Sequence, residues 1–199
     1  MVTRNLAPKM VLLYLLKDFS STHTITILAK ELDLSRVGIW KILKKLEERK
    51  YLSLKSVGKG KTSTLIVNIN WENHLVEKML SFYLTEEAVK QRRWQVNFAE
   101  LENVIDFVIL YGSILHSPQE AGDIDIVGVT AKKNFVKIAE VIDNIQKTQS
   151  KKIHAINFTE SEFNMELQKP NKAFIDAIKK GIILFGQENF VKFMRDIIK

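Results

Sequence analysis

The chain of 199 residues contains no cysteine. Disulfide bonds, thiolate metal ligands and thiol nucleophiles all need that residue, so the sequence excludes disulfide-stabilised folds, cysteine metal sites and cysteine catalysis. The absence is typical of a protein from a reducing compartment. Hydrophobic residues make up 46% of the chain and charged residues 27%, which is the composition of a globular protein and not of a disordered one.

Long hydrophobic runs are also missing. The apolar stretch MVLLYLL at 10–16 ends at Lys17 and Asp18, and no small-residue cleavage site follows it. It is therefore interpreted as a helix of the core and not as a signal peptide. Nothing approaches the ~20 apolar residues of a membrane-spanning helix. The expected location is the cytoplasm, and no membrane partner is predicted.

Positive charge is present but concentrated in one region. The formal net charge of the chain is +7. Nine Lys or Arg residues and two Glu residues between Arg36 and Lys61 carry that same net charge by themselves. Charge of one sign gathered in one module indicates a polyanionic partner for that module, such as nucleic acid.

The first module, predicted at 1–72, consists of helices followed by a hairpin. Apolar periodicity predicts a first helix around MVLLYLL, a second over ITILAKELDL and a third over RVGIWKILKKLEERK, with Ser35 as the N-cap of the third. The strands YLSLKSV and TSTLIVNI follow, joined by the turn GKGK at 58–61. Their alternating pattern leaves one largely apolar face to pack on the helices.

This order of elements resembles a winged helix-turn-helix domain, and LAKELDLSRVGIWKILKKLEERKYL carries the resemblance. Asp33 and Lys50 occupy turns where such domains often have glycine. In this family the third helix enters the major groove and the wing follows the phosphates. The resemblance therefore implies DNA contacts from Arg36, Lys41 and Lys44 on the helix and from Lys55, Lys59 and Lys61 on the wing. A solvated helix face and a winged helix that binds only proteins stay open, and Trp40 could stack on a base or pack under the wing.

The segment 73–102 contains neither proline nor glycine and predicts one or two helices. Its apolar stripe is predicted to consist of Leu75, Met79, Phe82, Tyr83 and Val89. A connecting helix is the simplest interpretation, although a long amphipathic helix between two modules also suits a homodimer. The basic patch KQRRWQ at 90–95 suits either a larger nucleic-acid surface or a dimer partner.

The second module, predicted at 103–199, is an α/β unit on a small mixed sheet. Strands are predicted in VIDFVILYG, DIDIVGV and KIHAINF, with helices between and after them. Asp123 and Asp125 are two residues apart on a strand, so their side chains lie on one face. The residues that follow them, Ile124 and Ile126, point into the core. Two carboxylates this close repel each other unless a cation lies between them, and Mg²⁺ prefers oxygen ligands.

Gly112 and Ser113 end the strand before the aspartates, and a helix is expected to begin at Ile114. Backbone amides at such a turn can hold a polyphosphate. A phosphate-binding turn beside a metal site provides the parts that nucleotidyl transfer needs.

A Gly-Ser pair, a spacer and Asp-x-Asp together resemble the nucleotidyltransferase superfamily that includes DNA polymerase beta, in its small minimal nucleotidyltransferase branch. Gly112, Ser113, Asp123 and Asp125 match that pattern. The C-terminal IDAIKKGIILFGQENF is similar to the end of the same domain. The resemblance implies that Asp123 and Asp125 are catalytic residues and ligands of Mg²⁺, and that Gly112 and Ser113 bind a nucleoside triphosphate such as ATP.

The sequence also departs from that family. Ser117 stands where the spacer has glycine, Gly122 replaces the serine before the first aspartate, and the spacer is one residue shorter. Active members place a third carboxylate on the next strand, whereas KIHAINF offers only His154 and Asn157. His154 is interpreted as an ordinary strand residue. Catalysis, nucleotide or metal binding without turnover, and the loss of both therefore stay open.

The expected fold class is α/β in the broad sense, an α+β chain with two modules. The combination resembles a group of two-domain prokaryotic, chiefly archaeal, proteins. It implies a DNA-binding regulator that binds Mg-NTP and transfers a nucleotide to a hydroxyl of a protein or nucleic acid. An inactive nucleotidyltransferase-like transcription regulator and an antitoxin-type interaction protein are the alternatives.

Overall fold

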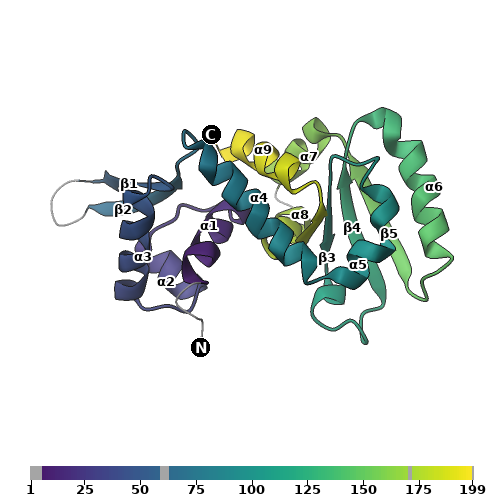
Figure 1. Ribbon diagram of the computed structural model, residues 1–199, viewed down its shortest axis with the longest axis horizontal. Helices are drawn as coiled ribbons and strands as arrows, with labels where there is room; N and C mark the ends of the chain where they lie inside the picture. Colours follow the sequence, from purple (N-terminus) through teal and green to yellow (C-terminus); the bar gives the residue numbers. More distant parts are fainter. Residues whose placement is uncertain (1–5, 59–62, 170–171, 199) are drawn as a thin grey trace. The chain divides into compact units, whose positions relative to one another are not determined.

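A computed structural model describes residues 6–58, 63–169 and 172–198 of the chain (Figure 1). Helices and two small sheets make up a mixed α+β fold, as the sequence predicts. The chain divides into two compact units, Met1–Leu80 and Ser81–Lys199. None of the described helices is long and apolar enough to cross a membrane.

The first unit contains three helices followed by a hairpin. The helices are α1 (Ala7–Lys17), α2 (Ile25–Glu31) and α3 (Arg36–Glu48), and the strands are β1 (Leu52–Val57) and β2 (Thr64–Ile69). α3 begins where predicted, and the Ser35 hydroxyl accepts a hydrogen bond of 3.0 Å from the Gly38 amide. The turns before and after α3 hold Asp33 and Lys50 at positive φ, 51° and 58°, a conformation that glycine adopts at lower cost.

β1 and β2 pair in antiparallel register, as predicted. Leu52 and Val67 are buried, so the apolar side of the hairpin is packed. An isolated bridge between Thr24 and Ile66 adds the segment before α2 to the hairpin. The turn predicted at 58–61 lies, apart from its first residue, outside the described residues.

Helix α4 (His74–Val89) begins in the first unit and ends in the second. The apolar stripe expected from the sequence is not its buried side, because Leu75, Phe82 and Val89 are 59–61% exposed. The buried side consists of Val76, Leu80, Leu84 and Ala88. Both sets recur at helical spacing, so periodicity alone could not distinguish them. Self-association through the exposed stripe stays a prediction.

The second unit contains a four-stranded sheet in the order β5-β4-β3-β6. Its strands are β3 (Phe107–Tyr111), β4 (Asp123–Val129), β5 (Lys152–Phe158) and β6 (Ile182–Phe185). β4 and β5 are parallel and the other pairs are antiparallel, so the sheet is mixed, as predicted. Helix α6 (Phe135–Gln146) connects the parallel pair.

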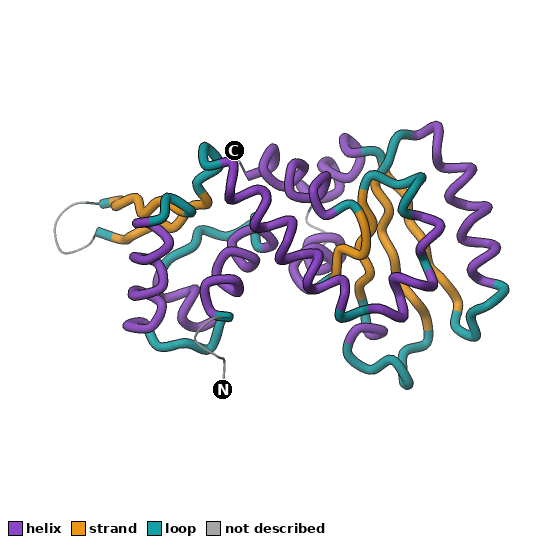
Figure 2. Tube along the Cα trace, in the orientation of Figure 1, coloured by secondary structure: helices purple, strands orange, loops and turns teal. Residues whose placement is uncertain are grey.

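Helices lie on both sides of this sheet (Figure 2). One face packs against α5 (Arg92–Asn97) and α6, and the predicted core residues Ile124 and Ile126 are buried there. The other face carries a cluster of phenylalanines with α7 (Glu160–Gln168), α8 (Lys172–Lys180) and α9 (Gln187–Ile198). Phe107 and Phe158 both pair with the last residue of β4. The cluster therefore fills one end of this face, and the opposite end, where β4 begins, carries polar residues.

Candidate functional site

Asp123 and Asp125 lie at the start of β4, on the face of the sheet that carries the phenylalanine cluster at its other end. Their side chains are 37% and 24% exposed. Ile124, between them, is 1% exposed and points into the opposite core. The alternation predicted from the sequence is confirmed, and burial of Ile124 fixes the direction of both carboxylates.

Gly112 follows the last residue of the neighbouring strand β3, and that residue, Tyr111, pairs directly with Asp125. The backbone angles of Gly112, φ 84° and ψ −166°, fall in a region that essentially only glycine adopts. A Cβ on Gly112 would lie 2.5 Å from Asp125 Oδ2. Glycine is thus needed for the backbone conformation and for the close approach of the chain to the carboxylate. Ser113, the next residue, is exposed beside the pair.

The helix predicted to begin at Ile114 is only a short 3-10 turn, η3 (Ser113–Leu115), so that prediction was wrong. The residue before a proline is disfavoured in the helical region, and Pro118 imposes this on Ser117. The Ser117 amide instead closes the turn on the Ser113 carbonyl at 2.8 Å. A turn this short has no appreciable macrodipole, so individual backbone amides would have to hold an anion here.

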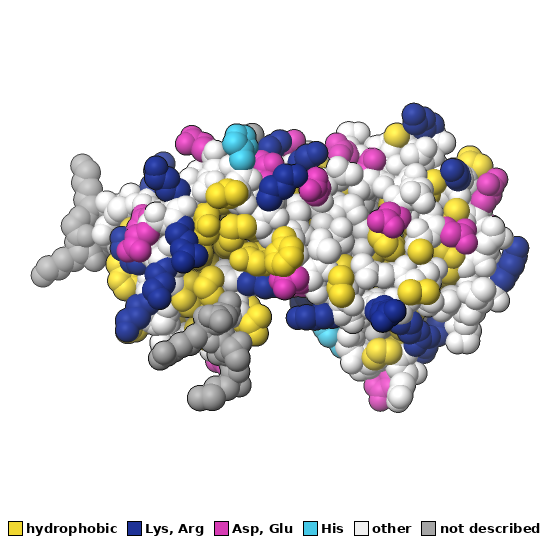
Figure 3. All heavy atoms as spheres, in the orientation of Figure 1, with side chains coloured by type: hydrophobic (Ala, Val, Ile, Leu, Met, Phe, Trp, Pro, Cys, Tyr) yellow, Lys and Arg dark blue, Asp and Glu magenta, His cyan; other side chains and the backbone are white. Residues whose placement is uncertain are grey.

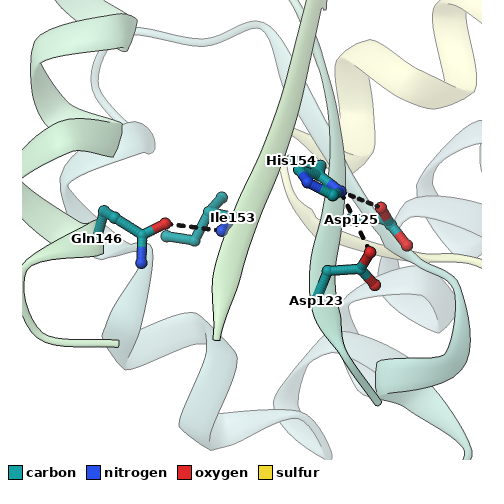
Figure 4. A network of polar contacts seen from close by, with 5 residues as sticks. All are labelled: Asp123, Asp125, Gln146, Ile153 and His154. Atoms are coloured by element: carbon teal, nitrogen blue, oxygen red, sulfur yellow. Dashed lines mark hydrogen bonds and ion pairs between the residues drawn. The ribbon is translucent and has the colours of Figure 1, made fainter. Parts of the chain in front are cut away.

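His154 lies against the two aspartates (Figure 4). Because β4 and β5 are parallel and pair Asp125 with His154, the imidazole points to the same face as the carboxylates. Its Nδ1 lies 3.2 Å from Asp123 Oδ2 and 3.6 Å from Asp125 Oδ1. One donor atom from each of the three residues lies within 4.8 Å of the others, so the group could hold a metal ion. The sequence-based interpretation of His154 as an ordinary strand residue missed this placement.

Two further polar residues on or after β5, Asn157 and Glu162, lie away from the aspartates. Asn157 is on the opposite face of β5, where its Oδ1 lies 2.5 Å from the place that a Cβ on Gly128 would take. Glu162 forms a capping box with Thr159 at the start of α7, beyond the far end of β5. Within the described part of the chain, no third carboxylate joins Asp123 and Asp125.

Two pKa values at the site are shifted, by burial and because the two carboxylates and the imidazole lie close together. Burial raises the pKa of Asp125, the charge of Asp123 raises it further, and His154 lowers it. Burial, followed by the charges of both aspartates, also raises the pKa of Tyr111. Tyr111 was not recognised in the sequence, although its place immediately before Gly112 was a usable signal. A bound cation would relieve the repulsion that contributes to both shifts.

Gln146, at the end of α6, anchors the strand that carries His154. Its Oε1 accepts a hydrogen bond of 2.7 Å from the Ile153 amide (Figure 4), and its Nε2 donates to the Lys151 carbonyl at 3.0 Å. The Lys151 ammonium in turn donates to the carbonyl of Ala121, in the loop that leads into β4. These bonds join the beginnings of β4 and β5, the two strands that carry Asp123, Asp125 and His154.

A separate hollow of about 540 Å³ lies at the other end of β4. Its lining residues are Asp106, Thr130, Ala131, Thr159, Glu160, Ser161 and Asn189. Two of these are acids and none is a lysine or arginine, so the hollow does not suit a phosphate ligand.

The basic residues predicted to contact DNA lie on the surface of the first unit. Arg36, Lys41 and Lys44 are exposed on α3, and Lys55 is exposed on β1. Lys59 and Lys61 lie outside the described residues. Figure 3 shows Lys and Arg side chains over the α3 surface that this view presents.

The exposed face of α3 is not purely basic. Val37 is 64% exposed and Trp40 is 36% exposed. The Lys44 ammonium lies 4.9 Å from the centre of the Trp40 ring and 2.8 Å from the Glu47 carboxylate. Cationic and apolar side chains therefore share one helix face, which could contact both phosphates and base edges.

Comparison with protein-family models, with curated proteins and with solved structures finds no match to this chain. The chemistry of the site therefore has to be inferred from its own residues.

Proposed function

We propose that the second unit binds a nucleoside triphosphate together with a divalent cation, as a nucleotidyltransferase-like domain of the minimal branch. One observation carries the proposal: the Gly112 backbone lies against the carboxylate of Asp125 at one end of the sheet, and Asp123 lies on the same face of β4. ATP and Mg²⁺ are the ligands that the resemblance implies. The donor set fits a divalent cation because two carboxylates and an imidazole converge there.

Each residue has a defined task in this proposal. Asp123 and Asp125 would hold the cation, which would neutralise phosphate charge and polarise the reacting phosphorus. Gly112 and Ser113 are exposed and would offer backbone amides and a hydroxyl to phosphate oxygens. Ile124 keeps the carboxylates on the ligand side because its own side chain is buried in the opposite core.

The reaction proposed for this site is transfer of a nucleotide to a hydroxyl group of a protein or nucleic acid. The acceptor oxygen forms a bond to the α-phosphorus, the bond from that phosphorus to the pyrophosphate oxygen breaks so that pyrophosphate leaves, and the hydroxyl proton passes to solvent. In the family that the sequence resembles, a third carboxylate serves as metal ligand or as base. The described residues bring no such carboxylate to the pair, and this favours a second candidate, a nucleotide-binding regulator without turnover.

For the first unit we propose DNA binding by a winged helix-turn-helix, with α3 in the major groove and the hairpin along the phosphates. The support is the order of three helices and a hairpin, together with the exposed Arg36, Lys41, Lys44 and Lys55. The whole chain would then be a DNA-binding regulator whose second unit senses or transfers a nucleotide. An antitoxin-type role, in which the second unit acts on a protein, uses the same site.

Calorimetric titration tests nucleotide binding without knowledge of the acceptor. ATP and the other nucleoside triphosphates would be titrated, with and without Mg²⁺, into wild type and the double variant Asp123→Asn/Asp125→Asn. Asp143→Asn, an exposed position on α6, makes the same chemical change away from the site and serves as the control. We expect metal-dependent binding in wild type and control and none in the double variant. Absence of binding in wild type would overturn the proposal.

Incorporation of α-labelled nucleotide into protein or nucleic acid would then distinguish an enzyme from a regulator without turnover. Incorporation that disappears in Asp125→Asn would assign the reaction to this site. Equal incorporation by that variant would exclude the assigned site, and binding without incorporation would favour the second candidate.

A further inference from the structure

We propose that the cluster of Asp123, Asp125 and His154 binds a first-row transition-metal ion, of the class of Mn²⁺ and Zn²⁺, in preference to Mg²⁺. The inference deepens the proposed function because it concerns the same site. It applies to the metal ion alone, with no nucleotide present.

The spacing of the three side chains fits one ion. Ligand atoms that each lie about 2.1 Å from a metal are about 3.0 Å apart at octahedral angles and about 3.4 Å apart at tetrahedral angles. The His154 Nδ1 is 3.2 Å from Asp123 Oδ2 and 3.6 Å from Asp125 Oδ1. Small rotations of these side chains would place all three donors around a single centre, and Figure 4 shows them converging from two adjacent strands.

The chemistry of the donors then decides which ion is favoured. Mg²⁺ demands oxygen ligands and keeps several waters, so an imidazole nitrogen adds little to its binding. Transition-metal ions accept carboxylate oxygen and imidazole nitrogen together, and affinity for such mixed sites rises from Mn²⁺ towards Zn²⁺. A histidine in place of a third carboxylate therefore shifts the preference of the site away from Mg²⁺.

The structure also holds the histidine in position for this task. The hydrogen bond from the Ile153 amide to Gln146 fixes the backbone immediately before His154. On the other side of the cluster, the Asp125 carboxylate lies directly against the Gly112 backbone, where an added Cβ would be 2.5 Å from its Oδ2. Donors fixed by their neighbours lose less conformational freedom when they bind a metal.

The competing arrangement needs no metal. His154 could be held only by the 3.2 Å contact of its Nδ1 with the Asp123 carboxylate, with the second carboxylate solvated. That arrangement predicts no metal preference, so the two are separated by direct measurement of metal binding.

The measurement is the electron paramagnetic resonance signal of free Mn²⁺, recorded as the full-length protein is added without nucleotide. Mg²⁺ and Zn²⁺ are then added as competitors. The variants are His154→Ala, which removes the nitrogen donor, and His154→Asp, which supplies an all-oxygen set. His74→Ala, an exposed histidine on α4, is the matched control.

We expect wild type and His74→Ala to bind one Mn²⁺ per chain, with Mg²⁺ displacing it only at about tenfold or greater excess and Zn²⁺ at equal or lower concentration. His154→Ala should lower Mn²⁺ affinity about tenfold or more. His154→Asp should keep Mn²⁺ binding but let Mg²⁺ compete on nearly equal terms. Mn²⁺ binding by His154→Asp would also show that replacement of His154 does not by itself unfold the site.

The inference is overturned if wild type binds no Mn²⁺, if Mg²⁺ competes equally with it, or if His154→Ala leaves the preference unchanged. Its failure is distinct from that of the proposed function. Equal Mg²⁺ competition with nucleotide binding intact removes only the metal preference. Mn²⁺ binding with no nucleotide binding removes only the proposed function.

Discussion

Gly112→Ala is the substitution that tests the geometry of the site most directly. The backbone at φ 84° and ψ −166° is one that a residue with a side chain adopts at a cost of about 1–3 kcal/mol. The added methyl would also lie 2.5 Å from Oδ2 and 3.4 Å from the carboxyl carbon of Asp125. That carboxylate can rotate away, so the clash should displace a proposed metal ligand and not unfold the unit.

We therefore expect Gly112→Ala to lower the free energy of unfolding by about 1–3 kcal/mol and to weaken cation binding at the same time. Urea denaturation would measure the first effect and Mn²⁺ titration the second. A loss of 1 kcal/mol in the free energy of unfolding lowers the Tm by about 2–4 °C for a chain of this size. Thermal unfolding therefore measures the same change independently.

Gly122→Ala is the matched control because it makes the same change at the residue before Asp123. A Cβ there would meet no atom within 4 Å, so no clash is expected. The free energy of unfolding should stay equal or rise by about 0.4–1 kcal/mol, since alanine restricts the unfolded chain. If Gly112→Ala were as stable as wild type and bound the cation equally well, the account of the turn and of its contact with Asp125 would be refuted.

Three further predictions concern charge. The pKa of Asp125 is raised by burial and by its neighbouring carboxylate, so its ionised form destabilises the folded state. Asp125→Asn should therefore raise the Tm at pH 7, and this gain in Tm should vanish below about pH 3.9. Hydrogen bonds from Thr159 lower the pKa of Glu162, so the cap stabilises the fold above the ordinary glutamate pKa and is lost as the pH falls through the lowered one. Glu162→Gln should reduce the Tm at pH 7, and its difference from wild type should shrink as the pH falls below the ordinary glutamate pKa. Lys41→Ala should reduce the slope of log binding constant against log salt concentration for duplex DNA by about 0.9, whereas Lys133→Ala, exposed in the second unit, should leave the slope unchanged in the same filter-binding assay.

Features that depend on a few neighbouring residues were predictable from the sequence. The Ser35 cap and the alternation around Ile124 both depend on residues within four positions of each other along the chain. The stripe on α4 was not predictable, because the helix has apolar residues on two sides and only packing selects the buried one. The turn after Gly112 was misjudged because a helix start was expected where Pro118 limits it.

In the candidate site, too, only the features set by neighbouring residues could be predicted from the sequence. Asp123 and Asp125 share a face because alternation within one strand requires it. The residue of the neighbouring strand that lies beside them cannot be predicted from that strand alone. That placement is set by the pairing of β4 with β5, which puts His154 opposite Asp125. A slip of one residue would turn the imidazole to the other face of the sheet and bring Ile153 or Ala155 beside the aspartates. The alternation that buries Ile153 at 7% exposure in the core excludes that slip. The hydrophobic packing on one face of the sheet thus decides the donor set on the other, and with it the metal that the site would prefer.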